Sequence, residues 1–131
     1  MAKLMRDTTK TGRILLADDE EMVRKAIRMI LGFGGYQIEE AGDGEEAVQK
    51  YVDASPPYDL VLLDLDMPRV SGAEALARIR THNPGAKAIL LSGGVHYPGP
   101  ERMIFLQKPF DVQQLIGLVR EALESDAPDR A

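Results

Sequence analysis

Two aspartates at the end of an apolar run are the residues of this sequence best suited to chemistry. The stretch 60–72 reads LVLLDLDMPRVSG, so an apolar run leads directly to Asp64, and Asp66 follows closely. A carboxylate placed at the end of a buried strand can attack phosphorus and become an acyl phosphate. The stretch therefore indicates phosphoryl transfer, with Asp64 as the candidate nucleophile.

Further polar residues stand at the ends of other apolar runs. Asp18 and Asp19 follow the run ILLA, Ser92 follows AILL, and Lys108 stands just beyond MIFL. Ligands of an open parallel sheet bind beyond the carboxyl ends of its strands, near the point where the strand order reverses. These side chains are therefore expected to meet Asp64 at one edge of a sheet.

Such a meeting of acids has a consequence for the charge of the site. Two carboxylates about 4 Å apart repel each other by roughly 4 kcal/mol at an effective dielectric constant of about 20. Either some of them take up protons or a cation lies between them. Oxygen ligands around one small site suit Mg²⁺, which commonly binds one or two carboxylates together with phosphate oxygens. The metal and Lys108 would offset the charge of a transferring phosphoryl group, and the Ser92 hydroxyl could donate to one of its oxygens.

The chain has the alternating pattern of an α/β domain. Strands are predicted at 14–17, 36–41, 60–63, 88–91 and 103–106. Continuous apolar runs are typical of strands that are covered on both faces, whereas the partly alternating run 36–41 is typical of an edge strand. Alternation with helices predicts right-handed βαβ units and a doubly wound, flavodoxin-like sheet of five parallel strands in the order 2-1-3-4-5.

Apolar residues at helical spacing predict helices at 23–31, 44–53, 72–81 and 112–123. The first helix is expected to end at the glycines 32, 34 and 35. Asp43, Ser71 and Asp111 are expected to cap the three later helices.

One connection differs from the rest. The stretch between Ser92 and Lys108 contains glycines at 93, 94 and 99 and prolines at 98 and 100. These residues disfavour a helix, so the fourth helix of the fold is expected to be shortened to one turn at most or to be missing.

Length and composition exclude several classes of protein. With 131 residues the chain fits one domain, assigned to 13–124, between a flexible arm (1–12) and a flexible tail (125–131). The lack of cysteine excludes disulfides and thiolate metal sites and favours the cytoplasm. A net charge of −5 argues against nucleic-acid binding. No apolar stretch is long enough for a membrane span.

The ordered set LLADDEE, LVLLDLDMPRVSG, LLSGG and FLQKPF resembles the receiver domain of two-component response regulators, over about 13–124. FLQKPF after a shortened segment resembles the receivers of hybrid histidine kinases. The resemblance implies that a histidine kinase or a histidine phosphotransfer protein phosphorylates the domain in a Mg²⁺-dependent reaction. The domain then changes conformation and signals to a downstream protein, so it is no enzyme beyond its own phosphorylation and dephosphorylation.

The resemblance also assigns roles around the phosphoacceptor. Asp64 matches the phosphoacceptor itself. Asp19 matches the direct metal ligand, Asp18 the acid that acts through water, and Asp66 the residue whose backbone carbonyl binds the metal.

Three further matches lie on the last two predicted strands or just after them. Ser92 matches the hydroxyl residue that turns toward the phosphoryl group, and Lys108 matches the lysine of the site. Phe105 matches the switch aromatic, although it could equally be an ordinary core residue. Receivers usually have a cis bond before the proline that follows this lysine, so Lys108–Pro109 is expected to be cis.

Two other readings remain open from the sequence. In a haloacid-dehalogenase-type phosphatase, Asp64 would be the nucleophile and Asp66 the general acid/base. That class, however, places its nucleophile at the start of the domain and needs a later acidic motif that is missing here. In a degenerate receiver the site would only bind partner proteins.

The shortened segment also removes much of the helix that many receivers use to dimerise, so a monomer or a weak dimer is expected.

Overall fold

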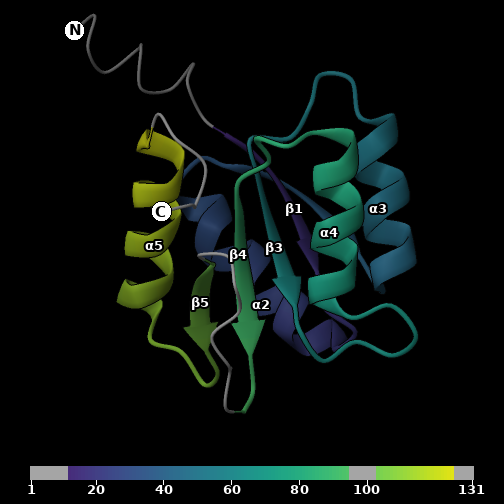
Figure 1. The fold of residues 1–131 in the computed structure, drawn as a ribbon. Helices are drawn as coiled ribbons and strands as arrows, with labels where there is room; N and C mark the ends of the chain where they lie inside the picture. Colours follow the sequence, from purple (N-terminus) through teal and green to yellow (C-terminus); the bar gives the residue numbers. More distant parts are fainter. Residues whose placement is uncertain (1–11, 95–102, 126–131) are drawn as a thin grey trace, which may run out of the picture.

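The computed structural model describes residues 12–94 and 103–125 as a three-layered α/β domain (Figure 1). Its sheet has five parallel strands in the order β2-β1-β3-β4-β5. The strands are β1 (Arg13–Ala17), β2 (Gln37–Ala41), β3 (Leu60–Asp64), β4 (Ala88–Ser92) and β5 (Ile104–Gln107). The described helices are α2 (Glu21–Phe33), α3 (Gly44–Asp53), α4 (Gly72–His82) and α5 (Val112–Glu124). The predicted fold class and strand order are confirmed.

The sheet is covered on both faces, which explains its continuous apolar strands. On β1, Ile14 and Leu16 belong to one buried cluster, which α2 and α5 complete. Leu15 and Ala17 point to the opposite face and belong to a second cluster, completed by α3 and α4. Because side chains alternate across a strand, every residue of β1 from Ile14 onward is buried. The central strands are therefore packed between two apolar cores, one on each face of the sheet, and these cores fix the positions of their carboxyl ends.

Caps fix the starts of three helices, as the sequence predicts. The side chains of Asp43, Ser71 and Asp111 each accept a hydrogen bond from a backbone N–H in the first turn of α3, α4 and α5. The start of α2 has no such side-chain cap on Glu20. Instead, the Asp18 carboxylate accepts from the Glu20 N–H, with Oδ1 2.9 Å from the nitrogen.

The predicted end of α2 was wrong at one glycine. The helix passes through Gly32 and ends at Phe33, and Gly34 is its C-cap. A single glycine inside a helix costs only about 1 kcal/mol, so it need not stop the helix. Gly35 marks the actual turn, because its φ of 90° is favourable only for glycine.

Three predictions fall on other parts of the chain. The shortened or missing fourth helix was expected between Ser92 and Lys108, and residues 95–102 of that stretch lie outside the described residues. The flexible arm and tail likewise fall mainly on 1–11 and 126–131, outside the described ranges. Among the described residues, no helix is long and apolar enough to cross a bilayer.

Candidate functional site

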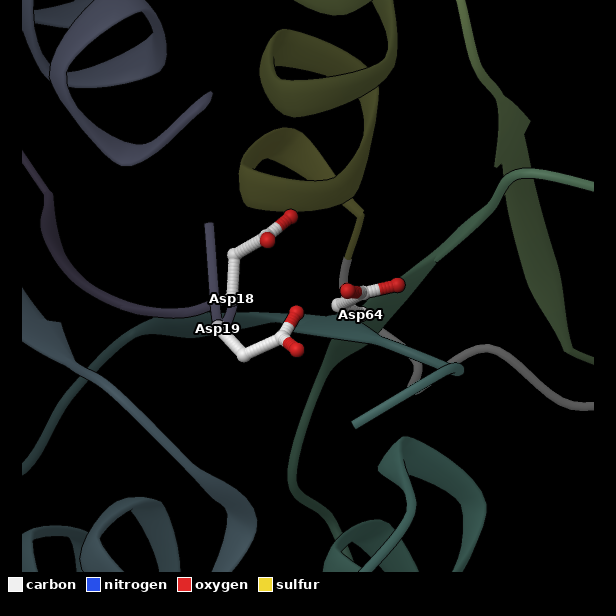
Figure 2. Close-up of side chains that lie close together, drawn as sticks. All are labelled: Asp18, Asp19 and Asp64. Carbon is white, nitrogen blue, oxygen red and sulfur yellow. The ribbon is translucent and has the colours of Figure 1, made fainter. Parts of the chain in front are cut away.

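Three carboxylates meet at the carboxyl ends of β1 and β3. Asp18 and Asp19 follow β1, and Asp64 ends β3, its neighbour in the sheet. One oxygen of each residue lies within 4.8 Å of the others (Figure 2). Asp18 and Asp64 are buried, whereas Asp19 is exposed. The structure thus brings together the three acids that the strand ends indicated.

Asp18 is held by hydrogen bonds to both carboxylate oxygens. Oδ1 accepts from the Glu20 N–H, and Oδ2 lies 2.8 Å from the Lys108 Nζ. Its backbone N–H donates to the Ala41 carbonyl at 3.3 Å, which continues the β1–β2 pairing. A fully buried carboxylate needs such partners, since an unpaired charge is costly away from water.

Lys108 joins the last strand to this acidic cluster. Its Nζ lies 3.5 Å from Asp64 Oδ2 and 3.6 Å from Glu20 Oε1, in addition to its bond with Asp18. Burial alone lowers the pKa of Lys108, but the hydrogen bond with Asp18 and the charges of Asp18, Asp64 and Glu20 raise it above its ordinary value. The lysine is therefore a permanent cation of the site. The Lys108–Pro109 peptide is cis, as expected.

Asp64 is the acid that is hardest to ionise. Its pKa is raised to about 6, first of all by burial and then by the charges of Asp18 and Asp19. The N–H of Asp66, which donates to Asp64 Oδ1 at 3.1 Å, and the ammonium of Lys108 act in the opposite direction. The site therefore holds more negative charge than Lys108 offsets, which favours a bound cation.

The remaining predicted site residues lie around this centre. Ser92 ends β4 and is buried, and its hydroxyl donates to the Gly94 carbonyl at 2.9 Å. The Asp66 side chain is exposed, so its contribution to the cluster is the backbone N–H. Phe105 is half-buried on β5 and packs against the core under α3 and α4. This packing is compatible with either role considered for Phe105.

Gly72 supports the site in a way that the sequence analysis did not predict. A Cβ built on it would lie 2.4 Å from the carbonyl oxygen of Asp64, far inside van der Waals contact. The start of α4 can therefore pack this closely against the backbone of Asp64 only when residue 72 is a glycine. The available signal was the glycine that follows Ser71 at the start of a predicted helix.

This close approach predicts a destabilised Gly72→Ala variant. The added methyl group meets backbone rather than a flexible side chain, so the loop after β3 must shift, at a cost of about 2 kcal/mol. Gly117→Ala in α5 is the matched control, because a Cβ at Gly117 meets nothing within 4 Å. It should be neutral or stabilising by up to about 1 kcal/mol. Urea unfolding of both variants measures the difference, and equal free energies of unfolding would contradict the prediction.

Arg24 is a second residue that the sequence analysis missed. It lies in the first turns of α2, where the helix dipole disfavours a cation. Its guanidinium bonds the Asp18 carbonyl and the Glu40 side chain instead. A cation near a helix N-terminus was the signal that could have drawn attention to it.

Comparison with known proteins places this arrangement in a family. The family model for the response regulator receiver domain matches residues 14–120. The chain belongs to the response regulator receiver family. The matched range includes all three clustered acids, Ser92 and Lys108.

Curated relatives contain this receiver as one part of a longer protein. The sensor kinase CckA of Brucella abortus (strain 2308) is 32% identical over 124 residues, which are 90% of this chain and 13% of that protein. The response regulator MprA of Mycobacterium sp. (strain KMS) is 33% identical over 125 residues, 89% of this chain and 53% of that protein. The chain thus spans about half of one relative and a small part of the other.

Solved receiver structures have the same fold. The receiver domain of the hybrid histidine kinase CckA is 34% identical with a TM-score of 0.75, over 86% of this chain and 100% of that one. The response regulator TrrA from Thermotoga maritima, in complex with Mg²⁺ and BeF, is 35% identical with a TM-score of 0.77, over 86% and 100% of the two chains. The similarity to receivers of hybrid kinases and of response regulators agrees with the resemblance drawn from the motifs, and the phosphatase reading is not favoured.

Proposed function

We propose that this receiver accepts a phosphoryl group on Asp64 in a Mg²⁺-dependent reaction and passes the signal to a partner protein. The observation that carries the proposal is the cluster of Asp18, Asp19 and Asp64 around the ammonium of Lys108. This set supplies a buried nucleophile, oxygen ligands for a divalent cation and a fixed positive charge.

Four residues fit the metal. Asp19 and Asp64 would bind Mg²⁺ directly, Asp66 through its backbone carbonyl and Asp18 through water. Hard oxygen donors and an excess of negative charge are what Mg²⁺ requires. The Mg²⁺–BeF complex of the Thermotoga receiver supports the proposal, because that protein is 35% identical to this chain. When bound, the metal would offset negative charge on the transferred group and on Asp64.

The transfer itself is a displacement at phosphorus. With a phosphohistidine donor, an oxygen of Asp64 forms the new bond to phosphorus while the bond from phosphorus to the imidazole nitrogen breaks. The electron pair of that bond stays on the imidazole, which takes up a proton from solvent. Lys108 offsets charge on the phosphoryl oxygens from the side of β5.

Ser92 and Phe105 are the proposed switch. The Ser92 hydroxyl would exchange its bond to the Gly94 carbonyl for a phosphoryl oxygen. The movement of β4 toward the phosphoryl group would leave room for Phe105 to change its packing on β5. Phosphorylation then shifts an equilibrium between two conformations of the domain.

Partners and location belong to the same proposal. The phosphoryl donor is a histidine kinase or a histidine phosphotransfer protein, and the receiver of the signal is a protein whose identity the site does not determine. The composition, free of cysteine, fits a protein that acts in the cytoplasm. Catalysis is limited to the domain's own phosphorylation and dephosphorylation.

Labelling with a small phosphodonor tests the proposal. Incubation of the wild-type protein with Mg²⁺ and ³²P-acetyl phosphate should give at most one label per chain, stable in acid and labile in base, as an acyl phosphate is. Repeated turnover of a generic phosphate ester would instead favour the phosphatase. Absence of any label would favour a degenerate receiver that only binds partners.

A further inference from the structure

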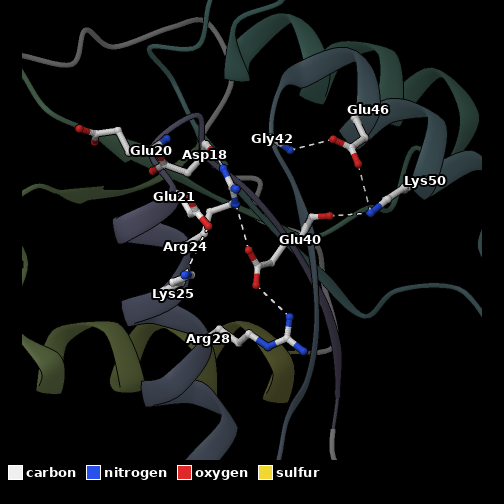
Figure 3. A network of polar contacts seen from close by, with 10 residues as sticks. All are labelled: Asp18, Glu20, Glu21, Arg24, Lys25, Arg28, Glu40, Gly42, Glu46 and Lys50. Carbon is white, nitrogen blue, oxygen red and sulfur yellow. Dashed lines mark hydrogen bonds and ion pairs between the residues drawn. The ribbon is translucent and has the colours of Figure 1, made fainter.

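Arg24 connects the metal-site loop to the edge strand of the sheet. Its Nη1 donates to the carbonyl oxygen of Asp18 at 2.6 Å, and its Nε lies 3.0 Å from Glu40 Oε1 on β2 (Figure 3). The Asp18 carbonyl belongs to the peptide group that joins Asp18 to Asp19. One guanidinium therefore fixes the peptide group from which both acids of the proposed metal site project.

The contact is sheltered from water. The side chains of Arg24 and Glu40 are 18% and 23% exposed, and Asp18 is fully buried. A charged donor bonded to a buried carbonyl contributes more than a solvated surface pair, because that carbonyl otherwise loses its partner. The planar guanidinium can also donate to two acceptors at once, whereas the compact ammonium of a lysine has no such fixed fork of donors.

Glu40 is itself held in place by two further basic residues. Arg28 of α2 donates to its Oε2 at 2.8 Å, and Lys50 of α3 donates to its backbone carbonyl at 2.6 Å (Figure 3). The hydrogen bond from Arg28, and then that from Arg24, lowers the pKa of Glu40, so the carboxylate stays ionised. Arg24 thus rests on a fixed anion of β2, and the loop is anchored to the sheet through it.

We propose that Arg24 is a positioning residue of the metal site, which sets the Mg²⁺ affinity through the Asp18 carbonyl without touching the ion. The inference rests on the proposed function, since it concerns the same site. Rotation of the Asp18–Asp19 peptide would displace the Asp19 carboxylate from Asp64 and the Asp18 carboxylate from Lys108. Groups that orient the ligands of a metal commonly change its affinity 10- to 100-fold when they are removed.

Arg28 offers a matched control on the same helix. It pairs with the other oxygen of Glu40, and within the described residues no hydrogen bond or ion pair joins it to Asp18. Arg24→Ala is expected to weaken Mg²⁺ binding about 10-fold, and Arg28→Ala by less than about 2-fold. Arg24→Lys keeps the positive charge but cannot donate to the Asp18 carbonyl and Glu40 with the same fixed geometry. Its affinity for Mg²⁺ should therefore lie between those of the wild type and Arg24→Ala. Calorimetric titration with MgCl₂ measures each dissociation constant.

A second measurement separates positioning from general stability. Thermal unfolding in EDTA gives the stability of each metal-free variant, so a loss of stability without a change in Mg²⁺ affinity would show a merely structural role and overturn the inference. Equal Mg²⁺ affinities of Arg24→Ala and Arg28→Ala would do the same. If Arg24→Ala does not fold, wild-type affinity of Arg24→Lys overturns it. Failure of the wild type itself to bind Mg²⁺ would instead reject the proposed function.

Discussion

Asp64→Asn is expected to abolish the acyl-phosphate label completely and, at the same time, to stabilise the metal-free protein. The substitution removes the carboxylate whose ionisation burial and its acidic neighbours make costly. A pKa raised from 3.8 to about 6 corresponds to roughly 3 kcal/mol at neutral pH. The amide can still accept the Asp66 N–H through its oxygen. For a domain of this size the melting temperature should rise by about 10 °C.

The pH dependence of stability follows from the same pKa. Between about pH 4 and pH 6 the folded wild type binds a proton on Asp64 that the unfolded chain has already released. The contribution of Asp64 to stability is therefore greatest at low pH and is lost as the pH rises through about 6. The difference in free energy of unfolding between Asp64→Asn and the wild type should grow over this range and level off above it.

Urea unfolding in EDTA at several pH values measures this difference. Asp53→Asn is the control, because Asp53 lies at the exposed end of α3 and its side chain, within the described residues, accepts a hydrogen bond only from Gln49. Its effect should stay within about 0.5 kcal/mol at every pH. Addition of Mg²⁺ should stabilise the wild type and not Asp64→Asn. A variant less stable than the wild type in EDTA would show that Asp64 is not the strained acid of the site.

Much of the site could be predicted because it depends on strand ends. Asp18, Asp64 and Ser92 each end or follow an apolar run, and parallel strands bring such positions to one edge. The strand order was equally accessible, since the alternating β2 had to be an edge. These features depend on hydrophobic pattern and topology, which a single sequence contains.

The parts that could not be predicted depend on side-chain rotamers and on the local direction of the backbone. The hydroxyl of Ser92 bonds Gly94, and a sequence does not fix a rotamer. The bond from Arg24 to the Asp18 carbonyl joins a side chain to a backbone group whose direction is set only by the folded loop. The close approach of Gly72 to Asp64 is likewise a matter of backbone path. Such contacts refine a site whose members were already identified.

Lys108 holds the cluster together from the far strand, so Lys108→Ala is expected to have the largest destabilising effect at the site. Removal of the ammonium leaves the fully buried Asp18 carboxylate with the Glu20 N–H as its one remaining hydrogen-bond donor within the described residues, and breaking a buried pair costs about 3 kcal/mol. The loss should be smaller at pH 5 than at pH 7, because Lys108 lowers the pKa of Asp64 and its removal favours the protonated acid. Urea unfolding at the two pH values measures both effects.

Lys25→Ala is the control for this lysine. Lys25 pairs with Glu21 on the exposed surface of α2, where such a pair contributes at most about 0.5 kcal/mol.

The same Lys108→Ala variant should respond more weakly to beryllofluoride with Mg²⁺, as seen in the NMR signals of Phe105, because the cation that follows β5 and would pair with the phosphoryl mimic is then missing. A response equal to that of the wild type would show that Lys108 stabilises the acids without transmitting phosphorylation to β5, which would leave Ser92 as the residue that acts on Phe105.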